Sequence, residues 1–137
     1  IMTTAAVAGA WWKNGLDSPC AHSREPQGYR LIEVADGGAI TNRFIPYAVA
    51  SEAAEYIVRQ SCGRRFVNVF DASPRTHVEI EGLGQLQPID PLAASSVGMA
   101  AHFFEVPADF DHGDIQGCIT FEDGRRHEVA LSLVAVD

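Results

Sequence analysis

The chain has 137 residues, a formal net charge of −8 and an isoelectric point near 5.0. This length is sufficient for one domain with a hydrophobic core. The excess of negative charge argues against a surface for nucleic acid or for an anionic membrane, because both would repel the chain. No apolar run is long enough to span a bilayer, and no basic segment marks a signal peptide. We therefore expect a soluble protein that binds neither nucleic acid nor membrane.

The first part of the sequence predicts three strands. Residues 3–12 are small and apolar and end in two adjacent tryptophans, as in a buried strand, and residues 13–27 form a loop. Residues 29–35 and 39–45 predict a hairpin, since Asp-Gly-Gly at 36–38 is a strong turn signal. Three strands without a covering layer are too few to fold alone.

The next stretch, residues 46–59, predicts one short helix. Ser51 is a suitable cap, Glu52 lies in the first turn, and alanines continue to Tyr56. The competing interpretation is a linker that ends in a strand.

The rest of the chain alternates short apolar strands with Gly, Asp and Pro turns. Its predicted strands are 65–70, 76–80, 83–88, 101–106, 117–121 and 127–136. Strands of this length and spacing are typical of an antiparallel two-sheet β-sandwich. We predict an all-β protein with at most one short helix: terminal strands of another domain at 1–46, a linker at 47–62, and a β-sandwich at 63–137.

Cysteines and histidines offer few site candidates. Cys20, Cys62 and Cys118 make no C-x-x-C pair, so we expect reduced thiols rather than a zinc or redox site. His77 and His102 fall within alternating strands, where packing or surface roles are commoner than metal ligation.

Two loops carry weaker candidates. Residues 109–114 place Asp109, Asp111, His112 and Asp114 together, and their oxygens and imidazole could hold a cation. The run lacks the full spacing of a calcium loop, so a solvated acidic turn is the favoured interpretation. Asp17 and His22 follow the tryptophan pair and form an isolated, weak signal.

Four motifs in order resemble the C-terminal part of calcineurin-like metallophosphoesterases. They are Trp11-Trp12, Pro26-x-Gly28-Tyr29, Val67-Asn68-Val69 and Asp90-Pro91. Ser23 and Arg24 stand where that family has Asp-Gly, and Thr76 or His77 stands where it has an aromatic residue.

The resemblance implies a non-catalytic region, because the family's metal-binding motifs precede the tryptophan strand and are missing here. A catalytic domain elsewhere in the protein would hold two divalent metals and hydrolyse a phosphoester. Ile1 before Met2 fits a piece of a longer protein. The implied partners are that domain and a second copy paired through open strand edges.

The resemblance places the binding candidates in a loop beside the substrate cleft. They are Trp11, Trp12, His22 and Tyr29, although packing of both tryptophan rings is the favoured interpretation. No catalytic or metal-binding residue is expected in this chain. The alternative function is a stand-alone β-sandwich module that binds carbohydrate or protein through exposed aromatic rings.

Overall fold

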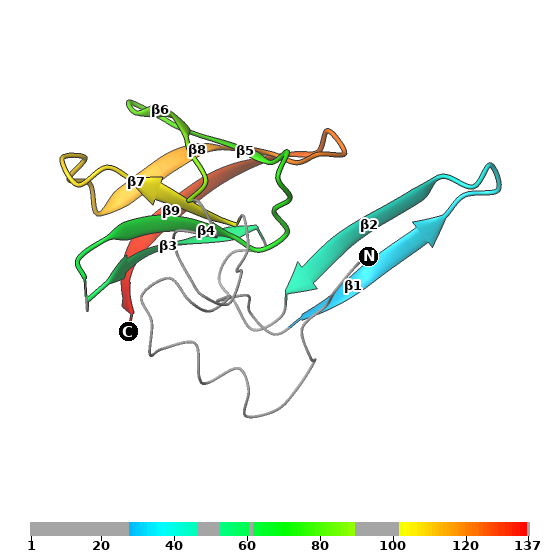
Figure 1. The fold of residues 1–137 in the computed structure, drawn as a ribbon, viewed down its shortest axis with the longest axis horizontal. Helices are drawn as coiled ribbons and strands as arrows, with labels where there is room; N and C mark the ends of the chain where they lie inside the picture. The colour runs from blue at the N-terminus through cyan, green and yellow to red at the C-terminus, as the bar shows by residue number, and fades with distance from the viewer. Residues whose placement is uncertain (1–27, 47–52, 61, 90–101, 137) are drawn as a thin grey trace.

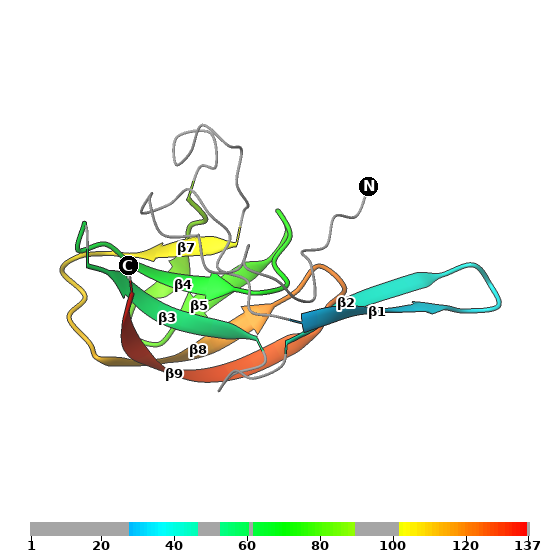
Figure 2. The same ribbon diagram turned by 90° about the horizontal axis from the view of Figure 1, so that it is seen from below.

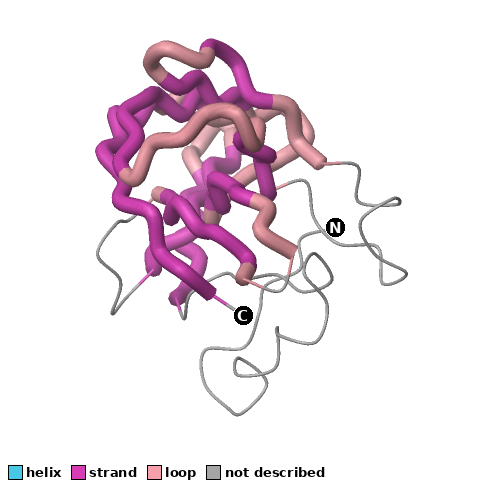
Figure 3. The backbone as a smooth tube through the Cα atoms, turned by 90° about the vertical axis from the view of Figure 1, so that its left-hand side faces the viewer, coloured by secondary structure: helices cyan, strands magenta, loops and turns pink. Residues whose placement is uncertain are grey.

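The computed structural model describes residues 28–46, 53–60, 62–89 and 102–136 (Figure 1). These ranges contain strands, turns and loops and no helix, as the backbone trace also shows (Figure 3). The strands are β1 (Gly28–Val34), β2 (Ile40–Pro46), β3 (Ala54–Arg59), β4 (Arg65–Val69), β5 (His77–Ile80), β6 (Gly84–Leu86), β7 (Phe103–Val106), β8 (Asp114–Thr120) and β9 (Arg126–Val136). The all-β prediction is therefore confirmed for the described residues.

Strands β3 to β9 form one hydrogen-bonded sheet in the order β6-β5-β8-β9-β3-β4-β7. The sheet is strongly curled (Figure 2), and its two end strands, β6 and β7, approach each other. Pro88, just after β6, bridges Phe104 in β7, and the Ile89 amide donates to the Phe103 carbonyl oxygen at 2.9 Å. We call this curled seven-stranded sheet the barrel.

The predicted two-sheet antiparallel sandwich is not confirmed. The seven strands share one continuous hydrogen-bonded order, and β3 runs parallel to β9, from Tyr56 opposite Leu133 to Arg59 opposite Val136. Side-chain alternation shows which face of a strand is buried, but it does not show whether neighbouring strands divide between two sheets.

The predicted helix over residues 46–59 is wrong, because Pro46 ends β2 and Ala54–Arg59 is β3. Both faces of β3 are buried, so Ala54, Tyr56 and Ile57 give it no clean two-residue alternation. The competing interpretation, a linker that ends in a strand, matches the described residues. The predicted linker at 47–62 thus contains a strand that lies between β4 and β9.

The barrel encloses one hydrophobic core to which each of its strands, or a turn beside it, contributes. Tyr56, Val67, Ile80 and Ile119 are almost fully buried there, together with Phe104. Burying side chains of this size contributes about 1.5–3 kcal/mol each. The same inner face therefore holds both ends of the sheet together.

Strands β1 and β2 form a separate two-stranded hairpin that projects from the barrel (Figures 1 and 2). Their register runs from Gly28 opposite Pro46 to Val34 opposite Ile40, and Gly38 supplies the positive φ of the turn. The hairpin prediction is confirmed within one residue. No hairpin residue belongs to the described core clusters of the barrel.

Gly117 marks a close approach between β8 and β5. An added Cβ would collide with the Glu79 carbonyl oxygen and come within 2.8 Å of Ile80 Cδ1. We expect Gly117→Ala to lower the free energy of unfolding by about 1–3 kcal/mol, because β8 must shift away from β5. Urea denaturation measures this change.

Gly113→Ala is the matched control, since an added Cβ there meets nothing within 4 Å. Equal stability of the two variants would contradict the close packing of β8 on β5.

Candidate functional site

The hairpin meets the barrel at the carboxylate of Asp71. Arg30 Nη1, from β1, donates to Oδ1 at 2.7 Å, and the Phe44 backbone amide, from β2, donates to Oδ2 at 3.1 Å. Arg125 Nη2, from the turn between β8 and β9, donates to Oδ2 at 3.2 Å. Three segments that are distant in the sequence therefore converge on one side chain, which is only 13% exposed.

Turn chemistry holds Asp71 and Arg125 in place. Asp71 lies two residues after the end of β4, and just beyond it the Ser73 amide donates to Thr76 Oγ1 at 2.9 Å. In the β8–β9 turn, the Arg125 amide donates to Asp123 Oδ1 at 3.0 Å and Gly124 has a φ of 85°. These hydrogen bonds within the two turns position the two charged side chains on the barrel.

Ionisation favours this arrangement. Burial opposes the charged form of Asp123, but hydrogen bonds from the Arg125 amide and guanidinium outweigh it and hold the pKa of the carboxyl below its usual value. Burial likewise opposes the charge of Arg125, but its hydrogen bonds to Asp123 and Asp71 outweigh it and raise the pKa of the guanidinium.

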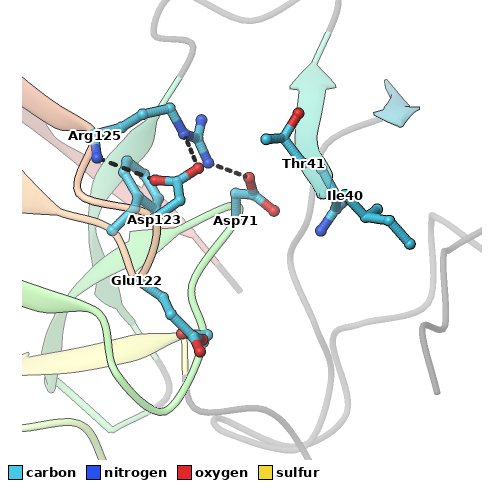
Figure 4. A pocket seen from close by; sticks show the side chains of 9 residues that line it. Ile40, Thr41, Asp71, Glu122, Asp123 and Arg125 are labelled. Carbon is cyan, nitrogen blue, oxygen red and sulfur yellow. Dashed lines mark hydrogen bonds and ion pairs between the residues drawn. The ribbon is translucent and has the colours of Figure 1, made fainter. Parts of the chain in front are cut away.

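A groove of about 360 Å³ lies beside this junction (Figure 4). One wall is β2, and the other is formed by the turns after β4 and β8. Its lining residues are Ile40, Thr41, Asn42, Asp71, Ser73, Phe121, Glu122, Asp123 and Arg125. The groove is therefore bordered by both the hairpin and the barrel.

Arginines accompany the carboxylates of the groove. Asp71 pairs with Arg30 and Arg125, and Glu122 pairs with Arg75 at 2.9 Å. Within the described ranges, no group of three His, Cys, Asp or Glu side chains is placed to hold a metal ion. The arrangement suits a charged junction between two structural units.

Most of the predicted binding residues cannot be placed. Trp11, Trp12 and His22, like Asp17, lie outside the described residues. Tyr29 lies in β1 opposite Ile45 and is 53% exposed, on the hairpin face opposite Arg30. Tyr29 is thus accessible but does not line the groove.

The acidic run at 109–114 behaves as a solvated turn. Asp109, Asp111 and Asp114 are exposed, and Asp111 pairs with Arg65 Nη2 at 2.9 Å. His112 packs its ring on Phe110, with ring centroids 4.4 Å apart. The favoured interpretation of this run is consistent with these positions.

The two strand histidines differ in environment. His77 is exposed and contacts the Gln85 amide at 3.1 Å. His102 is buried just before β7, with Nδ1 2.8 Å from Asn68 Oδ1, while Asn68 Nδ2 donates to Glu55 Oε1 at 3.0 Å.

This polar chain fixes the His102 tautomer. Because the Glu55 carboxylate accepts from the Asn68 amide, the Asn68 oxygen faces His102 and must accept from Nδ1–H. The Nε2 lone pair is buried without a described hydrogen-bond partner. Burial lowers the pKa of His102 from 6.5 to about 4, so the ring is neutral near pH 7.

The sequence does not reveal the junction at Asp71. Asp71 reads as an ordinary turn residue, and Arg30 and Arg125 read as solvated strand and turn charges. These residues are 41 and 54 positions from Asp71, and no local pattern links them. Only the folded arrangement brings them together.

Comparisons with known proteins provide no further identification. The sequence matches no family description, no curated protein and no solved structure. Within the described residues, no helix has the length and apolar character needed to cross a membrane.

His102 generates a prediction about acid stability. Its folded pKa of about 4 lies below its ordinary value of 6.5, so the unfolded chain binds the proton first. The contribution of the neutral His102 ring to the free energy of unfolding is therefore complete above pH 6.5. About 3 kcal/mol of this contribution is lost as the pH falls from 6.5 to 4. Urea titrations at several pH values in this range measure the slope of the free energy of unfolding against pH.

His102→Gln is expected to make this slope less steep, by the amount that corresponds to about one proton taken up on unfolding. His77→Gln, at an exposed position, is the control and should keep the wild-type slope. Identical slopes for His102→Gln and the wild type would show that His102 is not buried as a neutral ring.

Proposed function

We propose that this chain is a non-catalytic region of a calcineurin-like metallophosphoesterase that supports or borders the catalytic domain. The motif resemblance supplies the family, and the exposed apolar surface of the hairpin is the observation that carries the docking role. In this proposal the barrel is the C-terminal β domain, which the sequence predicts as a β-sandwich at 63–137.

The apolar surface consists of Ile32, Val34 and Ile40, which we call the hairpin patch. Val34 lies opposite Ile40, and Ile32 lies two residues before Val34, so all three side chains share one face. They are 52%, 68% and 65% exposed, respectively. Clustered exposed apolar side chains mark interaction surfaces.

The partner in this proposal is the catalytic domain of the same protein. That domain would bind two divalent metals, which activate a water molecule and clamp the phosphoryl oxygens for in-line attack. The role of the present chain is to bury the hairpin patch against that domain. A second copy, paired through the outer edges of β1 and β2, is the competing partner.

A carbohydrate-binding module is less well supported by the described residues. Sugars stack on exposed aromatic rings, and in this part of the chain Tyr29 is the one large aromatic side chain that is more than half exposed. The hairpin patch is aliphatic, which suits a protein partner better than a sugar.

The hairpin patch gives the test. In the longer protein, we expect Ile32→Ser combined with Ile40→Ser to lower the thermal stability of the catalytic domain, because its contact with the hairpin is weakened. In this chain alone, the same variant should leave stability nearly unchanged, since both side chains are largely exposed already. Calorimetry of both proteins provides the comparison.

Glu33→Gln, at an exposed residue on the opposite hairpin face, is the matched control and should affect neither protein. Hydrolysis of p-nitrophenyl phosphate by this chain alone with Mn²⁺ would contradict the non-catalytic assignment. Gel filtration that shows a stable dimer of this chain would favour the second copy as the partner.

A further inference from the structure

Among the residues that the structure describes, the hairpin and the barrel share little packing. They belong to different hydrogen-bonded sheets, and the described core clusters of the barrel include no hairpin residue. Among the described residues, every hydrogen bond and ion pair between the two units ends on Asp71. Beside Asp71, a groove separates side chains of the hairpin from side chains of the barrel.

Each guanidinium at this junction also has a second partner within its own unit. On the hairpin, Arg30 Nη1 donates to Asn42 Oδ1 at 3.1 Å, and the guanidinium lies 5.7 Å from the centroid of the Phe44 ring. On the barrel, Arg125 donates to Asp123 and lies 4.7 Å from the centroid of the Phe121 ring. Separation of the two units would therefore leave neither arginine without a partner.

We propose that Asp71 is a reversible latch that holds the hairpin, as a separately folded arm, against the barrel. When the contacts to Asp71 are made, the hairpin patch has a fixed orientation relative to the barrel. When they break, the hairpin can change its orientation while both units stay folded. The device is independent of which molecule covers the patch.

The Phe44 amide reports directly on the latch. The Ala35 amide donates to the Ala39 carbonyl oxygen at 2.9 Å, so Ala35 and Ala39 are a hydrogen-bonded pair of the hairpin. In an antiparallel hairpin such pairs alternate with pairs that are not hydrogen-bonded, so the amides of odd-numbered residues point to the partner strand and those of even-numbered residues point away from it. Phe44, an even-numbered residue, directs its amide outward to Asp71. The Phe44 amide therefore reports on the latch, whereas those of Leu31 and Arg43 report on the integrity of the hairpin.

Residue-resolved hydrogen exchange by NMR tests the proposal. We expect Asp71→Asn to reduce protection of the Phe44 amide about tenfold or more, because a neutral amide oxygen accepts this hydrogen bond much more weakly than the carboxylate does. Protection at Leu31 and Arg43, and at Val67 in the barrel, should stay within about twofold of the wild type. Arg30→Gln, which removes the latch from the hairpin side, should give the same pattern if Asp71→Asn folds poorly.

Asp123→Asn is the matched control, because Asp123 shares Arg125 but makes no described contact with the hairpin. Its Phe44 amide should keep wild-type protection. Unchanged Phe44 protection in both latch variants would show that other contacts hold the hairpin. Loss of protection throughout the hairpin or the barrel would show that Asp71 is part of one cooperative fold, and either result would overturn the proposal.

Discussion

The carboxylate of Asp71 is the constraint on which the arrangement of this molecule depends. A partly buried charge is costly unless hydrogen bonds satisfy it, and here two guanidinium groups and one backbone amide do so. The hairpin supplies two of these donors and the barrel supplies one. Within the described part of the chain, the hairpin therefore contacts the barrel through this carboxylate, and the described core clusters do not include the hairpin.

The barrel explains why the hairpin remains apart. All seven of its strands already enclose one core, and the bridge between Pro88 and Phe104 brings the two ends of the sheet together. Strands β1 and β2 form a separate sheet, and Ile32, Val34 and Ile40 are exposed on it. That exposure, together with the motif resemblance, is the basis for proposing that the hairpin packs against a catalytic domain.

Local patterns predict much of this fold. The Asp-Gly-Gly turn at 36–38 and the alternation of Val78 and Ile80 predict their elements correctly, because turn conformation and one-sided burial leave a signal in adjacent residues. Strand β3 was predicted as a helix because burial of both faces removed its alternation. The parallel pairing of β3 with β9 and the junction of Arg30, Asp71 and Arg125 depend on contacts between distant residues, which no local pattern encodes.

The coupling between Arg30 and Asp71 tests the central claim most directly. A double-mutant cycle with Arg30→Gln and Asp71→Asn, measured as free energies of unfolding in urea, separates their interaction from the other effects of each change. The structure predicts a coupling free energy of about 1 kcal/mol or more, because the pair is only 15% and 13% exposed and lies 2.7 Å apart. Additive effects of the two substitutions, with no coupling, would contradict the claim that this carboxylate holds the hairpin to the barrel.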